Sequence, residues 1–304
     1  MVALVIAILG VSSSAILVRW STASSTVIAF YRVLFTLAAV APVAVLYQRD
    51  AFSRISGRDW IAAVAAGIAL AVHFVAFFES LSWTTIAASV TLVQTQPIFV
   101  AIGAVLLLDE RVDSRVAAGI VIALVGAVLM SLAEPGDALP TGGDATIGNL
   151  LAVGGAVMAA AYLLAGRSLR QRVPIFPYVT IVYAACVATL FPAVVVSDAP
   201  VVAYPPREWI LFLAMAAGPG LLGHTVLNWA LEHLESTVVS VSLLGEPVGA
   251  TLLGIVLLTE IPTQATVVGG VIVLAGIYVT ATSGTTRRIQ NDADGTDEDS
   301  SRRD

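Results

Sequence analysis

Several side chains that carry charge or a proton stand inside long apolar stretches of this 304-residue chain. Arg32 lies near the start of one stretch, and Glu246 stands directly before Pro247 in another. A charge in the middle of a bilayer costs from about 3 to more than 10 kcal/mol, so each needs a partner or a wet cavity. Arg32 could clamp an anionic group of a substrate, form a gate ion pair, or snorkel to the outer headgroups.

Glu246 has a counterpart elsewhere in the chain, because Gln96 precedes Pro97 just as Glu246 precedes Pro247. A proline removes a backbone donor and can kink a helix, which turns free carbonyls toward a cavity. Of these two polar side chains only Glu246 can take up a proton, so we predict a proton-coupling role for it. The alternative is a carboxylate paired with a nearby His or Arg for packing alone.

Other polar and aromatic side chains accompany these two. His224, Asn228 and Glu232 recur every four residues and so share one helix face, and histidine, with an ordinary pKa of about 6.5, can relay protons. The alternative is that the histidines only bond neighbouring helices. The predicted substrate-binding residues are Arg32, His73, Gln94, Gln96, Tyr162, Tyr183, His224, Asn228 and Trp229. No HExxH or nucleophile motif occurs, so we expect no catalytic residue, metal or cofactor.

The composition indicates the elements that must hold these residues. Hydrophobic residues make up 58 % of the chain, charged residues only 12 %, and the mean hydropathy is +0.92. This excludes a soluble enzyme, a nucleic-acid binder and a disordered protein. A spanning helix needs about 20 mostly apolar residues. The predicted fold is therefore an all-α integral membrane protein with ten transmembrane helices, at 2–18, 27–47, 60–78, 86–108, 116–133, 147–165, 178–196, 209–227, 238–258 and 266–282.

The basic residues, all arginines, predict the orientation of these spans. With the N-terminus in the cytoplasm, the inner loops and the tail contain twelve arginines, and the outer loops contain only Arg19 and Arg207. Because inner loops are enriched in basic residues, both termini are expected to be cytoplasmic. Residues 284–304 have four arginines, six acidic residues and no apolar periodicity, which predicts a disordered acidic cytoplasmic tail.

The chain also matches itself when it is shifted by 150 residues. Nine identities occur in thirty ungapped positions, and among them are Pro97, Glu110, Gly119 and Gly126, which fall on Pro247, Glu260, Gly269 and Gly276. We therefore predict two five-helix repeats, 1–133 and 147–283, joined by an extracellular linker, 134–146. Because five is odd, the second repeat enters the membrane inverted. Inverted repeats are typical of secondary transporters whose substrate site lies at the midplane.

The repeated residues other than proline have structural interpretations. Glu110 and Glu260 end spans four and nine on opposite sides, where each either binds backbone donors of the turn or marks the mouth of the path. The glycine pairs let spans five and ten pack closely, so we expect these spans to form a scaffold or a homodimer contact.

The layout resembles the EamA-type permeases of the drug/metabolite transporter superfamily. The resemblance covers all ten spans and depends on the doubled five-helix pattern, the Arg in Phe30-Tyr31-Arg32, and the repeated Pro, Glu, Gly and Gly. It implies export or exchange of small metabolites, from amino acids to other solutes, across the cell membrane. The first helix departs from the family pattern, because it lacks the Trp-Gly often found there and has only Gly10 nearby.

The leading hypothesis is thus a secondary active transporter of a small organic metabolite in the cell membrane, with alternating access around a central cavity. Its expected partners are that substrate and the lipid bilayer, and no nucleic acid. The alternatives are a passive channel and an intramembrane enzyme. Accumulation of a solute against its gradient would distinguish the transporter from the channel, and conversion of the solute would indicate the enzyme.

Overall fold

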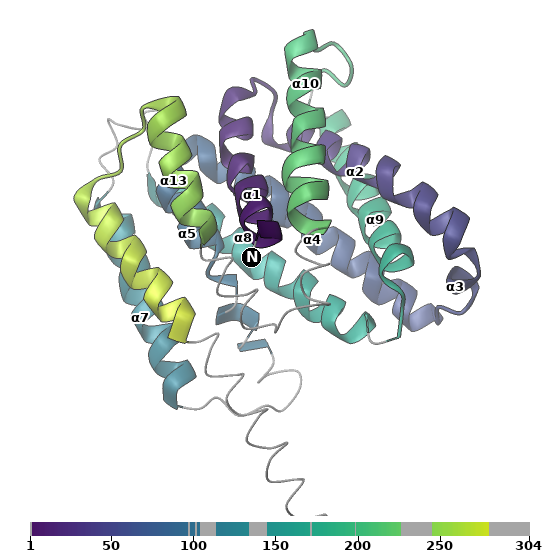
Figure 1. Cartoon of the computed structure of the whole chain (residues 1–304), viewed down its shortest axis with the longest axis horizontal. Coiled ribbons are helices and arrows are strands. Elements are labelled where there is room, and N and C mark those ends of the chain that lie inside the picture. The colour runs from purple at the N-terminus through teal and green to yellow at the C-terminus, as the bar shows by residue number, and fades with distance from the viewer. Residues whose placement is uncertain are drawn as a thin grey trace, which may run out of the picture.

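The computed structural model describes residues 2–96, 98–100, 102–103, 114–133, 145–170, 172–197, 199–225 and 245–279. All regular elements in these residues are helices (Figure 1). Four are long and apolar enough to cross a membrane: Ser25–Tyr47 (α2), Gly57–Trp83 (α4), Ala145–Gly166 within α8, and Ile175–Val196 (α9). The chain therefore has the helical, apolar architecture of a membrane protein.

The remaining helices fall on the other predicted spans. They are α1 (Val2–Trp20), α5 (Ile86–Val93), α7 (Ser114–Ala133), α10 (Pro206–Met215), α13 (Gly245–Leu258) and a last helix, Gln264–Val279. The whole of α8, whose spanning part is given above, runs from Ala145 to Leu169. A short helix, α3 (Arg49–Ser53), lies between α2 and α4. Predicted spans 86–108 and 238–258 extend into residues outside the described part, so the count of ten remains a prediction.

Polar residues in the breaks between apolar runs cap the N-termini of two of these helices. The Ser56 hydroxyl accepts a hydrogen bond from the Asp59 backbone N–H at 3.2 Å, and the Thr85 hydroxyl accepts one from Ala88 N–H at 3.2 Å. Each bond satisfies an N–H that the first turn of a helix leaves without a partner.

Predicted span 209–227 differs from expectation, because it is not one regular α-helix. The α-helix α10 ends at Met215 and continues as a π-helix, η2 (Ala216–Thr225), with Pro219 inside it. Proline has no N–H and its ring clashes with the preceding turn, so the helix widens there. A Cβ on Gly10 of α1 would lie 3.3 Å from the backbone N of Gly223, so α1 packs closely against this wide turn.

The following helix contacts, which are among the most extensive, join residues before position 133 to residues after position 145; α2 also packs on α4 within the first predicted repeat. Helix α4 packs on α8, and α1 packs on η2; α5 packs on α8, and α1 packs on α13. Likewise α4 packs on α9, and α2 packs on η2. Two further pairings, α2 on α9 and α5 on α13, join a helix to its own counterpart. When each helix is exchanged for its counterpart 150 residues away, this set of pairings is unchanged. In Figure 1, α1 accordingly lies between α13 and α10.

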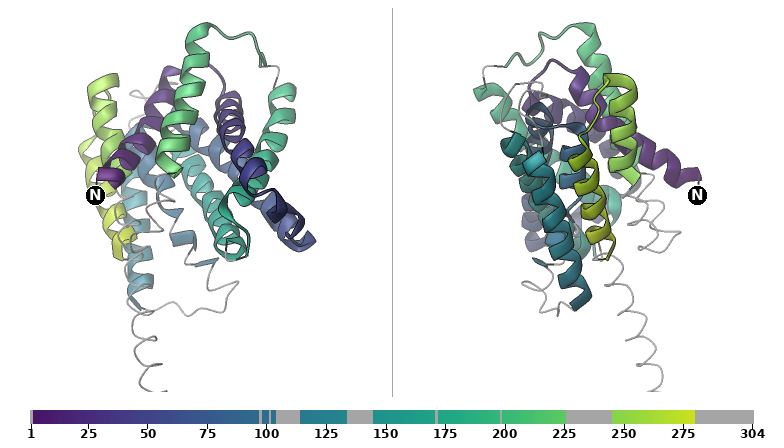
Figure 2. Two further views of the ribbon diagram at one scale, coloured as in Figure 1. Left: turned by 45° about the vertical axis from the view of Figure 1, so that its right-hand side comes forward. Right: turned by 90° about the vertical axis from the view of Figure 1, so that its left-hand side faces the viewer.

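Glycines bring α7 and Gln264–Val279 together within the chain. A Cβ on Gly126 would lie 2.7 Å from the carbonyl oxygen of Gly269, and one on Gly276 would lie 2.5 Å from that of Gly119. Both views of Figure 2 show these two helices side by side. The repeated glycines therefore form a contact inside one chain, which is the scaffold interpretation, and a homodimer remains a prediction.

Polar contacts at the helix ends join residues that the charge pattern predicts on the same membrane side. Thr84, in a predicted outer loop, and Asn149, at the outer end of predicted span 147–165, share a 2.9 Å hydrogen bond between their side chains. Arg172 and Asp59, both predicted inside, form a salt bridge of 2.8 Å. The side that faces the cytoplasm remains a prediction from the loop charges.

Candidate functional site

Arg32 of α2 is folded into the bundle. Its side chain and backbone are together only 4 % exposed, and Nη1 donates a 3.1 Å hydrogen bond to the Ser14 hydroxyl of α1. The guanidinium carbon lies 4.4 Å from the ring centre of Phe74 and 5.5 Å from that of Phe78, both on α4. The Arg32 side chain therefore points to its neighbours in the protein and does not snorkel to the outer headgroups.

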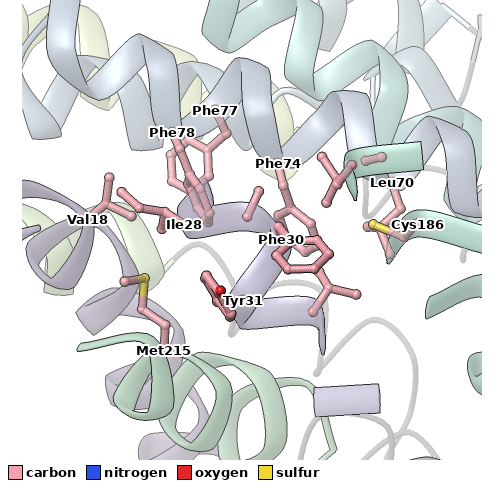
Figure 3. Close-up of a cluster of buried hydrophobic side chains, with 14 of the residues drawn as sticks. Val18, Ile28, Phe30, Tyr31, Leu70, Phe74, Phe77, Phe78, Cys186 and Met215 are labelled. Atoms are coloured by element: carbon pink, nitrogen blue, oxygen red, sulfur yellow. The ribbon is translucent and has the colours of Figure 1, made fainter. Parts of the chain in front are cut away.

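The two phenylalanines belong to a large buried cluster in which helices from both predicted repeats meet. Figure 3 shows Phe74 and Phe78 on one helix, with Phe30 near Phe74. A cation over an aromatic face gains about 0.5–2 kcal/mol, more when it is desolvated. The rings thus hold the planar guanidinium in a fixed position inside an apolar environment.

Glu246 lies in the first turn of α13 and is partly buried. The Gln94 side-chain N–H donates a 2.6 Å hydrogen bond to the Glu246 carboxylate, and Gln96 donates to the Gln94 side-chain oxygen at 3.4 Å. The Ser12 hydroxyl donates to the Glu246 backbone carbonyl at 3.3 Å. Three of the predicted residues, Gln94, Gln96 and Glu246, therefore form one hydrogen-bonded chain that joins residues from both predicted repeats.

Arg32 and Glu246 are also linked through space. The charge of Arg32 acts on the Glu246 carboxyl and on the Tyr183 hydroxyl. Arg32 and Gln94 come from the first predicted repeat, and Glu246 and Tyr183 come from the second. The fold thus brings a permanent cation and a titratable carboxyl to one polar centre, which we call the central cluster (Arg32, Gln94, Gln96, Tyr183 and Glu246).

The helix that carries Gln94 is interrupted at the cluster. Regular α5 ends at Val93, and the Thr95 N–H donates to the Leu92 carbonyl, three residues back rather than four. Because Pro97 has no N–H, the Val93 carbonyl also loses its usual helical donor. The backbone therefore leaves the α-helical pattern beside the Glu246 carboxylate, as the proline predicted.

His73 of α4 forms a hydrogen bond to a neighbouring helix, which was the structural alternative to a role in relaying protons. Its Nδ1 lies 2.9 Å from the Gly155 carbonyl of α8. A carbonyl can only accept, so Nδ1 carries the proton in this bond. Its ring stacks on Phe77 at 6.2 Å between ring centres. His73 thus ties α4 to α8, and its role in binding substrate remains a prediction.

The other predicted residues are placed less completely. Tyr162 of α8 is partly buried and packs against the hydrophobic cluster, as does Tyr183 of α9. His224 falls in η2, but its side chain lies outside the described residues, as do Asn228 and Trp229. Among the described residues, no group of three or more His, Cys, Asp or Glu side chains could hold a metal ion.

Sequence reasoning missed the residues that enclose Arg32. Phe74 and Phe78 are two of several aromatic residues in one apolar run, and their type alone gives no sign of a role. Their four-residue spacing was a usable signal, because it places both rings on one face of α4. Nothing in the local sequence indicated that this face meets α2 at Arg32, since that contact is set by the tertiary packing.

Comparison with known proteins identifies the class to which this fold and cluster belong. The family model described as the EamA-like transporter family matches residues 1–132 and again residues 146–282. The chain therefore belongs to the EamA-like transporter family, a family of membrane transporters.

Two named relatives agree with this assignment. The chain is 25 % identical over 258 residues to an uncharacterized transporter of Archaeoglobus fulgidus, and 28 % identical over 252 residues to the pseudopaline exporter CntI of Pseudomonas aeruginosa. Each alignment covers 83 % of this chain and 86 % of the relative. A solved crystal structure with 21 % identity has a TM-score of 0.61 and covers 95 % of this chain and 97 % of its own, which shows a shared fold.

Proposed function

We propose that this protein is a secondary active transporter that exports or exchanges a small organic metabolite, such as an amino acid, across the cell membrane. The observation that carries the proposal is the central cluster, in which Gln94 from one half donates a 2.6 Å hydrogen bond to the Glu246 carboxylate from the other. A site shared between two halves can be exposed to either side when one half moves against the other.

The proposed architecture is ten helices in two inverted repeats. The support is the double match of the family model, the nine identities at a shift of 150 residues, and the helix pairings that remain unchanged when the halves are exchanged. Two halves with nearly the same packing have inward-open and outward-open states of similar energy, which gives alternating access its physical basis.

The charges of the cluster favour a substrate with both signs of charge. The Arg32 guanidinium, which lies over the Phe74 ring, suits a carboxylate, because Arg donors form a fork that matches two carboxylate oxygens. Glu246 with the Gln94 side chain suits an ammonium or another donor group. An amino acid has both groups, and Tyr162 and Tyr183 are the proposed contacts for its apolar part.

Glu246 is the proposed proton carrier. The ionised Glu246 carboxylate pairs with the ammonium group of the substrate while Arg32 binds the substrate's carboxylate. When Glu246 takes up a proton instead, it loses the charge that holds the ammonium group, which favours release of the substrate. The proton and the substrate therefore compete for the same carboxylate, which couples their movement in opposite directions.

Transport in proteoliposomes tests this proposal. A metabolite screen in cells that overexpress the protein would first supply a substrate. Uptake and efflux are then measured with and without an imposed pH gradient. Accumulation against the substrate gradient supports coupled transport, whereas equilibration alone would support a channel and chemical conversion without movement would support an enzyme.

A further inference from the structure

Arg19, in the last turn of α1, forms an ion pair outside the central cluster. Its Nη1 lies 3.2 Å from a carboxylate oxygen of Glu260, which follows α13. Its Nη2 donates a 2.7 Å hydrogen bond to the Thr84 carbonyl at the end of α4. One arginine therefore connects α1, the α4–α5 turn and the end of α13, which belong to both predicted repeats.

Glu260 also binds a second partner, the N-terminus of α5. Its second carboxylate oxygen accepts a hydrogen bond from the Ile86 backbone N–H, the first residue of α5. A carboxylate at a helix N-terminus satisfies a free donor and interacts favourably with the helix dipole. Glu260 is thus both the partner of Arg19 and a cap on α5.

The same seam between α1 and α13 leads down to the central cluster. Ser12 lies two turns of α1 before Arg19, on the same helix face, and its hydroxyl contacts the Glu246 carbonyl. A Cβ on Gly249 of α13 would lie only 2.4 Å from the Ser12 hydroxyl oxygen. The seam is therefore closely packed at Ser12, and Arg19 and Glu260 close it at the end of the helices.

Three features allow this closure to be broken at modest cost. The side chains of Arg19 and Glu260 are 14 % and 19 % exposed, so water can replace their interaction. Arg19 Nε is buried and lacks a hydrogen-bond partner among the described residues, a lack that water would satisfy. Thr259, next to Glu260, has a φ of 56°, a left-handed conformation that costs a non-glycine residue free energy.

We propose that Arg19, Glu260 and the N-terminus of α5 form a latch that closes the α1–α13 seam and opens during transport. The loop charges place this latch at the outer end of the bundle. It rests on the proposed function, since it regulates access to the central cluster. In this structure the latch is closed.

Accessibility of Ser12 tests the latch directly. Ser12 has 0 % of its surface exposed, so in a Cys186→Ala background the Ser12→Cys variant reports on the seam. Right-side-out membrane vesicles are treated from outside with a membrane-impermeant maleimide, and the labelling rate is measured. Glu260→Gln removes the charge and keeps an oxygen for Ile86 N–H, whereas Glu260→Ala removes both contacts. Asp59→Asn breaks the Arg172 salt bridge at the opposite end and is the matched control.

The latch predicts that Glu260→Gln raises the labelling rate about fivefold, as expected from losing one partly exposed ion pair, and that Glu260→Ala raises it further. Asp59→Asn should leave the rate unchanged. If Glu260→Ala fails to fold, Arg19→Gln, which removes the same ion pair from the other side, should give the rise expected of Glu260→Gln. Unchanged labelling in a folded variant, or an equal rise with Asp59→Asn, would overturn the latch. Labelling needs no substrate, so this result is independent of whether transport itself is observed.

Discussion

The Gln94 side chain donates a 2.6 Å hydrogen bond to the Glu246 carboxylate, and this bond connects residues that lie 152 positions apart. Gln94 stands one turn before Pro97, and Glu246 stands directly before Pro247. The two proline-linked segments therefore meet face to face. Their meeting point joins the two predicted halves of the chain at a carboxyl that we propose carries the proton.

Glu246→Gln should abolish the pH dependence of transport and leave the fold intact, because a glutamine amide can still bond Gln94 but cannot take up a proton. The measurement is initial transport rate in proteoliposomes between pH 5 and pH 8, the range in which buried carboxyl groups and histidines titrate. Glu79→Gln is the matched control, since Glu79 is a partly buried carboxylate bonded instead to Ser25 and Trp83. Retained pH dependence in Glu246→Gln would reject the proton role.

Arg32→Ala should lower transport at least about tenfold, because it removes the cation proposed to bind the substrate. Arg32→Lys keeps the charge but not the planar fork above Phe74, so it should recover only part of the activity. The concentration dependence of uptake separates these effects, since lost binding raises KM. Full activity of Arg32→Ala would show that the substrate binds elsewhere.

Gly276→Ala should destabilise the protein by about 1–3 kcal/mol, because the new Cβ would meet the Gly119 carbonyl at 2.5 Å and force α7 away from the last helix. Gly154→Ala is the matched control, with no atom within 4 Å of its added Cβ. Thermal unfolding in detergent should show a lower Tm for the first variant only. Equal Tm values would mean that the two helices separate freely.

Stability at low pH should depend on Glu208, which is 1 % exposed and lies just before the predicted span 209–227. Burial alone would raise the pKa of Glu208, but hydrogen bonds from Ser21 and Thr22 and the charge of Arg207 together lower it below its usual value. A carboxyl with a lowered pKa stabilises the fold fully above its unfolded pKa and loses this contribution as the pH falls through its folded pKa.

Glu208→Gln should therefore lower Tm at neutral pH and reduce the loss of Tm below about pH 4. Thermal unfolding between pH 3 and pH 7 is the measurement, at the low end of which carboxylates become protonated. An unchanged slope of Tm with pH would show that another carboxylate is responsible.

Helices were predictable from the sequence because apolar runs of spanning length have few other stable forms in lipid. Predicted spans 27–47 and 178–196 coincide closely with α2 and α9. The interruption before Pro97 also follows from covalent chemistry. The π-helix at Pro219 was not predicted, because a proline in an apolar run can kink, end or widen a helix, and the choice depends on the neighbouring α1.

The candidate site was predictable only in part, because the sequence shows its charged residues but not the partners that tertiary packing brings to them. An arginine or glutamate in an apolar run needs a partner, so Arg32 and Glu246 stand out in the sequence alone. Their partners do not stand out, because Ser14 and Phe74 are ordinary membrane residues that act through tertiary contact. Arg19 was assigned to a loop, since an arginine that ends a span usually faces water, and its pairing with Glu260 depends on helix packing.

The central claim is that two halves of opposite orientation enclose one shared site, and the sidedness of Glu110 and Glu260 tests it most directly. Single cysteines are placed at these two positions in the Cys186→Ala background and labelled with an impermeant maleimide from each side of the membrane. The account predicts that residue 110 reacts from the cytoplasm and residue 260 from outside. Labelling of both positions from the same side would contradict it.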